Sequence, residues 1–201
     1  MASRKRITTL CFSDPHKNSH LIETDVRNLV LGLHGKASIQ CLASCHGHGW
    51  WRWLKREPYL YFHASAEVVE WIAAVIEVIP LSRQWKVTGA IHPELGLCFA
   101  LDPLEQSPFL GGHASDKNDL HIMACLLPDL VCFPQQNQNT YNDKKKAAQD
   151  LVPAFIERVG MLALRAPISG THRIAQRITT LFARFQRHNR SNSIQSHTGV
   201  D

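Results

Sequence analysis

The chain has 201 residues, of which 44% are hydrophobic and 19% charged, a balance typical of globular proteins and unlike that of disordered ones. The longest apolar stretch, residues 71–78, is interrupted by Glu77 and is too short to cross a bilayer. Lys and Arg outnumber Asp and Glu by 22 to 17, and no acidic residue lies between Glu157 and Asp201. This basic C-terminal end predicts an anionic partner, which is nucleic acid, a membrane surface or an acidic protein.

The N-terminus is basic but has no apolar stretch behind it, so it lacks the pattern of a signal peptide. We therefore expect a cytoplasmic protein. The six cysteines lack the density and regular spacing of a disulfide framework. In a reducing compartment they are expected to be free thiols, buried small side chains or metal ligands. The sequence indicates no particular cofactor.

The N-terminal half of the chain alternates between helical and strand-like patterns. The expected elements are, in chain order, a helix, two strands, a helix and a hairpin: 19–33, 37–44, 58–65, 65–80, 84–91 and 95–103. The β-branched residues of 65–80 leave a twisted strand pair as an alternative to the helix. The order predicts a two-layer α+β fold, with helices on one face of a mixed or antiparallel sheet.

The Pro/Gly/Ser-rich stretch 104–117 interrupts this order and predicts a boundary. We expect an α+β domain over 1–104, a mainly helical basic region over 105–190 and a disordered tail over 191–201. The region's last helix, 171–187, has an apolar stripe surrounded by arginines. Such a helix docks on its own domain, on nucleic acid, on an acidic partner or on a membrane surface.

Reactive residues are concentrated in "CLASCHGHGWWRW", which begins at Cys41. Cys41, Cys45, His46 and His48 are zinc-ligand types. Along a strand, however, residues 41 and 45 point to one face but lie ~13 Å apart at about 3.3 Å per residue, and no second Cys/His pair follows nearby. We therefore predict no metal site and expect Cys41 to be a core thiol.

The turn from Ser44 to Gly49 has glycines two residues apart, which permit the positive φ angles of an anion-binding nest. Cys45 is a candidate thiol nucleophile at its edge, with His46 or His48 as acid or base. Ser44 and Gly47 are then candidates for substrate binding. The simpler alternative is a tight turn between two strands.

Three tryptophans follow this turn, interleaved with cations. Exposed aromatic rings stack on bases, and adjacent cations neutralise phosphates. The alternative is that two of the tryptophans pack in the core. The residues predicted here to bind substrate are Trp51, Arg52, Trp53 and Lys55.

A helix with an acidic start, a strand ending in Ser-Cys-x-Gly and a Glu-Pro before an aromatic strand resemble the N-terminal half of the tRNA wybutosine-synthesis methyltransferase family. That family carries Ser-Cys-Ser-Gly-Arg at this place. Ser44, Cys45 and Gly47 match it, whereas His46 and His48 replace the serine and the arginine. The resemblance spans residues 20–102 and implies mainly a fold. If it extends to function, it implies methyl transfer from S-adenosylmethionine to a modified guanosine of tRNA, although the chain has no Gly-x-Gly-x-x-Gly cofactor loop.

The sequence thus predicts a protein that acts on or binds nucleic acid through the Ser-Cys-His-Gly-His turn and the adjacent tryptophans. In the enzymatic version of this prediction the protein modifies RNA. The alternative is a non-enzymatic interaction or inhibitor protein that uses the tryptophans and the basic C-terminal helix as contact sites. Whether the protein is an enzyme is left open by the residues alone.

Overall fold

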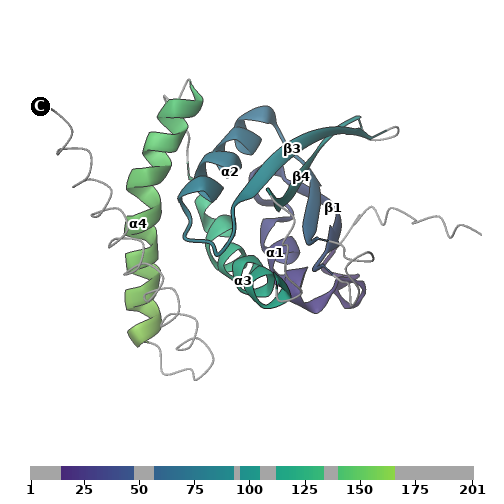
Figure 1. Ribbon diagram of the computed structural model, residues 1–201, viewed down its shortest axis with the longest axis horizontal. Helices are drawn as coiled ribbons and strands as arrows, with labels where there is room; N and C mark the ends of the chain where they lie inside the picture. The colour runs from purple at the N-terminus through teal and green to yellow at the C-terminus, as the bar shows by residue number, and fades with distance from the viewer. Residues whose placement is uncertain (1–14, 48–56, 93–95, 105–111, 134–139, 166–201) are drawn as a thin grey trace, which may run out of the picture.

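The computed structural model describes residues 15–47, 57–92, 96–104, 112–133 and 140–165. The elements are, in order, η1 (Ser19–Leu21), α1 (Thr24–Leu33), η2 (Lys36–Ser38), β1 (Gln40–Cys45), β2 (Tyr59–His63), α2 (Ala66–Val78), β3 (Trp85–His92), β4 (Gly96–Pro103), α3 (Gly112–Leu130) and α4 (Tyr141–Arg165) (Figure 1). The predicted helix 171–187 and tail 191–201 lie outside the described residues.

The four strands form one antiparallel sheet in the order β1-β2-β4-β3. The two hairpins are joined through β2 and β4, and α2 connects them. This confirms the predicted α+β class. The expected helix at 65–80 is α2, and it begins where the side chain of Ser65 caps the N–H of Val68.

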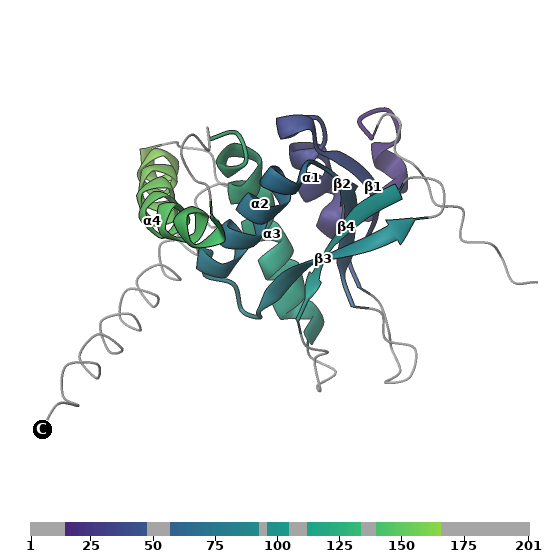
Figure 2. The ribbon, with the colours of Figure 1, turned by 90° about the horizontal axis from the view of Figure 1, so that it is seen from above.

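Side chains alternate across the sheet and divide its two faces. Leu60 and Phe62 of β2, together with Leu101 of β4, pack against α1, α2 and α3 and are at most 2% exposed. Figure 2 shows these helices gathered on that side of the strands. We call this the helix side of the sheet and the opposite side the outer face.

Two close contacts pack α1 and α2 against α3. A Cβ at Gly32 of α1 would lie 2.6 Å from Cγ of Pro128, so only glycine allows the two helices to approach this closely. Trp71 of α2 is 2% exposed, and its indole N–H donates to the carbonyl of Leu130 at 2.9 Å. The same carbonyl, at the end of α3, also accepts the backbone N–H of Phe133 at 3.3 Å, so it has two donors.

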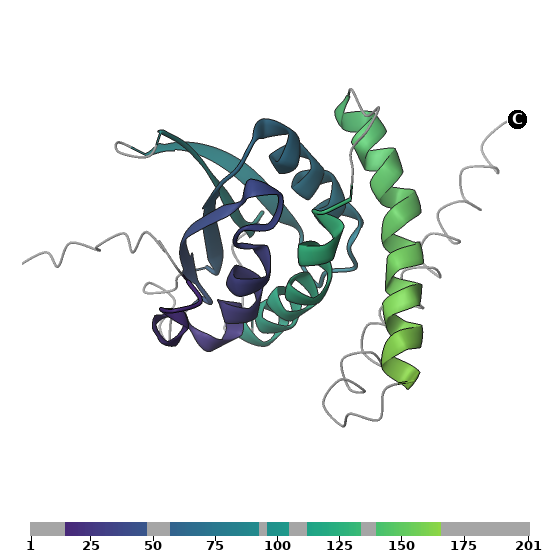
Figure 3. The same cartoon turned by 180° about the vertical axis from the view of Figure 1, so that it is seen from behind.

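α4 forms a further layer beside α2 (Figure 3). Its buried stripe of Lys144, Ala148, Val152 and Ile156 has helical spacing. The ammonium of Lys144 is buried but pairs with Glu70 of α2 at 2.6 Å. The boundary predicted at 104 falls inside a single hydrophobic cluster, because residues on both sides of it pack together. None of the described helices is long and apolar enough to cross a membrane.

Candidate functional site

A β-bulge in β1 separates the two cysteines that the sequence placed on one face. Cys41 pairs with Phe62 and Ala43 pairs with Tyr61, so two residues of β1 advance for one of β2. Beyond the bulge, Cys45 pairs with Tyr59. Cys41 therefore lies on the helix side and Cys45 on the outer face, which corrects the expected shared face. The bulge could not be recognised from alternation in the sequence.

Cys41 is the core thiol that the sequence predicted. It is 1% exposed, and burial raises the pKa of its thiol to about 12. Cys45 is also buried, but its sulfur accepts the backbone N–H of Gly47 at 3.4 Å. Gly47 has φ = 83°, the left-handed conformation that the glycine-rich turn predicted. The turn thus folds back onto the thiol.

His46 is held by a group of charged side chains that we call the charged clamp. Its backbone N–H donates to Oε2 of Glu23 at 2.6 Å, and its Nδ1–H donates to Oδ2 of Asp25 at 2.9 Å. The same Asp25 oxygen pairs with the ammonium of Lys117 on α3 at 2.9 Å. The clamp therefore ties the end of β1 to the start of α1 and to α3. The hydrogen bond from Lys117 is the main cause that lowers the pKa of Asp25 below its ordinary range.

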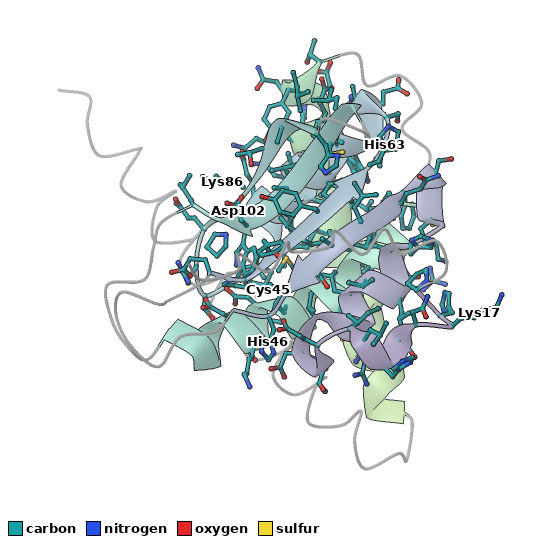
Figure 4. The ribbon with its side chains drawn as sticks, turned by 90° about the vertical axis from the view of Figure 1, so that its right-hand side faces the viewer. Lys17, Cys45, His46, His63, Lys86 and Asp102 are labelled. Carbon is teal, nitrogen blue, oxygen red and sulfur yellow. The ribbon has the colours of Figure 1, made fainter. Side chains whose placement is uncertain are left out.

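This geometry bears on the predicted nest and on the predicted thiol chemistry. The N–H of His46, which a nest would direct at an external anion, already donates to Glu23. The side chains of Cys45 and His46 diverge in Figure 4: Cys45 lies on the sheet and His46 lies at its edge beside α1. Ser44 pairs with Leu60 and faces the helix side. Among the candidate residues, the structure thus brings Cys45 and Gly47 together and directs His46 elsewhere.

The outer face carries polar and aromatic side chains, and none of the described helices lies over it (Figure 2). The rings of Tyr59 and Tyr61 lie 5.0 Å apart, tilted by 57°. Tyr61 is 38% exposed, and His63 further along β2 is also exposed. Lys86 and Asp102 are cross-strand partners on the same face, which is turned toward the viewer in Figure 4.

Asp102 is the acidic member of this face. Its Oδ1 is buried and has no hydrogen-bond partner among the described residues. Burial raises the pKa of this carboxyl, and the positive charge of Lys86 acts in the opposite direction. The outer face therefore combines two phenol rings in tilted contact, a histidine, an ammonium and one acceptor that no described donor satisfies.

The rest of the predicted site lies outside the described residues. His48, Trp51, Arg52, Trp53 and Lys55 belong to the connection between Gly47 and Glu57. Within the parts of the chain that the structure describes, no group of His, Cys, Asp and Glu side chains has the arrangement of a metal site.

The residues that position His46 were not among the predicted site residues. Glu23 and Asp25 were noted only as the acidic start of a helix, where carboxylates are common because they complement the helix dipole. Lys117 fell in the predicted boundary. The acidic pair was the available signal, but nothing in the sequence indicated which strand end it would meet. Tyr59 and Tyr61 were recognised as strand residues, without the information that their face lies opposite the helices.

No family model, no curated protein and no solved structure matches the chain in the three comparisons with known proteins. The resemblance to the wybutosine-synthesis methyltransferases therefore stays a prediction, which rests on Ser44, Cys45 and Gly47 and on the order of the elements.

Proposed function

We propose that the protein binds single-stranded nucleic acid across the outer face of its sheet. The observation that carries this proposal is the pair of tyrosines whose tilted rings are in contact on a sheet face opposite the helices, with Tyr61 38% exposed and with His63 and Lys86 on the same face. Bases of any sequence stack on aromatic rings that a sheet presents in this way, and cations beside the rings neutralise phosphates.

Two further features support the same interpretation. The connection from Gly47 to Glu57 joins β1 to β2 at the end where Cys45 and Tyr59 pair, and its sequence contains three tryptophans and several cations. The net charge of +5 favours a polyanionic ligand. Binding does not require Cys45 and His46 to act together in catalysis. The sulfur of Cys45 accepts the N–H of Gly47, whereas the ring of His46 donates to Asp25.

Tyr61→Ala tests the proposal directly. Stacking on one aromatic ring contributes about 1–3 kcal/mol, so this variant is expected to bind single-stranded RNA roughly 5- to 150-fold more weakly. The measurement is fluorescence anisotropy with a labelled RNA of roughly 12 nucleotides, within the usual site size of such proteins, and with DNA of the same sequence. The matched control is Phe133→Ala, because Phe133 is 39% exposed and follows α3, away from the outer face. It is expected to bind as tightly as the wild type.

The salt dependence provides a second readout. Affinity is expected to fall steeply as salt rises, and Lys86→Ala is expected to reduce the slope of log K against log salt by about one. Lys146→Ala, at an exposed lysine of α4, is the control for loss of a charge. Absence of binding to both RNA and DNA at low salt would overturn the proposal and favour a role in protein contacts.

A further inference from the structure

The β3–β4 hairpin reaches beyond the rest of the sheet. β3 and β4 pair from Trp85 to His92, whereas the described pairing of β4 with β2 covers only Phe99 to Leu101. The distal parts of β3 and β4 therefore form a two-stranded arm, which Figure 2 shows extending away from the helices.

This arm carries an apolar pair on the helix side. Ile91 and Leu97 are cross-strand partners, and the two-residue alternation places them on the same side as Val87 and Leu101. The arm extends past the helical layer, so Ile91 is 85% exposed and Leu97 is 53% exposed. Adjacent exposed apolar side chains on an extended arm are typical of an interaction surface.

The same hairpin has an unpaired edge. β3 is the last strand of the sheet, and no described strand pairs with its other side. Its edge thus presents backbone donors and acceptors that can bind an added strand. A cleft of about 870 Å³ lies along this edge between β3 and α2, and its apolar lining includes Ile79, Leu81, Trp85 and Val87.

We propose that this edge binds a second copy of the chain, with the two β3 strands antiparallel about a two-fold axis at Gly89. In this register Val87 of one copy pairs with Ile91 of the other on the helix side, and Thr88 pairs with Ala90 on the outer face. Gly89 pairs with its own copy at the axis. The sheets join into one of eight strands with all helices on the same side.

A second copy fits this edge because arm and cleft are complementary parts of one surface. Each arm lacks a helical layer behind Ile91, and each cleft is open beside Val87. One two-fold operation brings each arm over the cleft of the other copy. The interface then contains two identical arm–cleft contacts and is self-complementary.

The test is the mass of the full-length protein by sedimentation equilibrium over a concentration series. The wild type is expected to be a dimer, and Ile91→Lys is expected to weaken self-association roughly tenfold or more because it places a charge in the apolar part of the interface. Ile91 is 85% exposed, so the substitution leaves the monomer's core intact. The matched control is Leu21→Lys at the 51%-exposed Leu21 of η1, and it is expected to remain dimeric.

A disulfide tests the register. A Cβ at Gly89 would meet no heavy atom nearer than Cδ1 of Leu97 at 3.6 Å, so Gly89→Cys fits the strand. Under mild oxidation this variant is expected to give a covalent dimer on a non-reducing gel. The wild type, which retains the exposed Cys132, is expected to stay largely uncrosslinked. A monomeric wild type, or a dimer that is indifferent to Ile91→Lys and does not crosslink through position 89, would overturn the proposal.

Discussion

α3 is attached to the rest of the molecule by two polar networks of opposite character. Lys117 joins the charged clamp around His46, and its side chain is 53% exposed. The preceding residue, Asp116, is 0% exposed and pairs with Arg83 at 2.7 Å in what we call the buried network. Neighbouring residues of one helix thus enter two different environments. Similar ion pairs have different energetic weight in the two, because water screens the first and is excluded from the second.

The buried network joins α3 to the chain between α2 and β3. The carboxylate of Asp119 accepts the backbone N–H groups of Ser82 and Arg83 at 2.7 and 3.1 Å, and the indole N–H of Trp85 at 3.0 Å. The Arg83 guanidinium donates to Asp116 and, at 3.0 Å, to Glu57. Burial raises the pKa of Asp119, while its N–H donors act in the opposite direction. The three N–H donors therefore offset the cost of burying the charged carboxylate of Asp119.

Arg83→Ala should produce the largest difference between the two networks. It leaves Asp116 buried without its cation, and breaking a buried ion pair in this way costs about 3–5 kcal/mol. Lys117→Ala breaks the ion pair of the neighbouring residue in the clamp and should cost about 0–1 kcal/mol, because that pair is open to water. Urea denaturation of both variants measures the contrast. Equal losses would show that burial does not distinguish the networks.

Asp119→Asn probes the buried network with a smaller change of shape. The amide keeps one acceptor oxygen but directs an NH₂ group at existing N–H donors, and an unsatisfied buried group costs about 1–3 kcal/mol. Asp129→Asn, at an exposed carboxylate of the same helix, is the matched control and should be nearly neutral. If the two variants unfold at the same urea concentration, the three hydrogen bonds of Asp119 contribute no net stability.

The contrast also explains what the sequence could predict. The helical stripe of α2, its Ser65 cap and the strands β2, β3 and β4 follow local rules, so they could be predicted near their observed bounds. The side of the sheet on which Cys45 lies could not be, because one bulge near Cys41 reverses the alternation. Neither network could be predicted, because its members are far apart in the sequence. Asp25 and His46 become neighbours only when α1 packs beside β1, and Arg83 and Asp116 only when α3 packs on the core.

The smallest expected effect is the acid response of the charged clamp. The pKa of Asp25 is lowered in the folded state, mainly by its hydrogen bond from Lys117. Its contribution to stability is therefore present above the unfolded-state pKa of about 4 and is lost as pH falls through the lowered folded-state pKa. Because the clamp is open to solvent, that contribution is about 1 kcal/mol or less.

The variant Asp25→Asn isolates this contribution. The wild type should be more stable than the variant at pH 5. The difference in the free energy of unfolding should shrink as the pH is lowered toward 3, because Asp25 takes up a proton more readily in the unfolded state than in the folded one. Asp150→Asn, at an exposed carboxylate of α4, controls for the general effect of acid on the protein. A difference that grows toward pH 3 would reverse the sign argued from Lys117. It would mean that folding raises the pKa of Asp25, as burial raises that of Asp119 in the buried network.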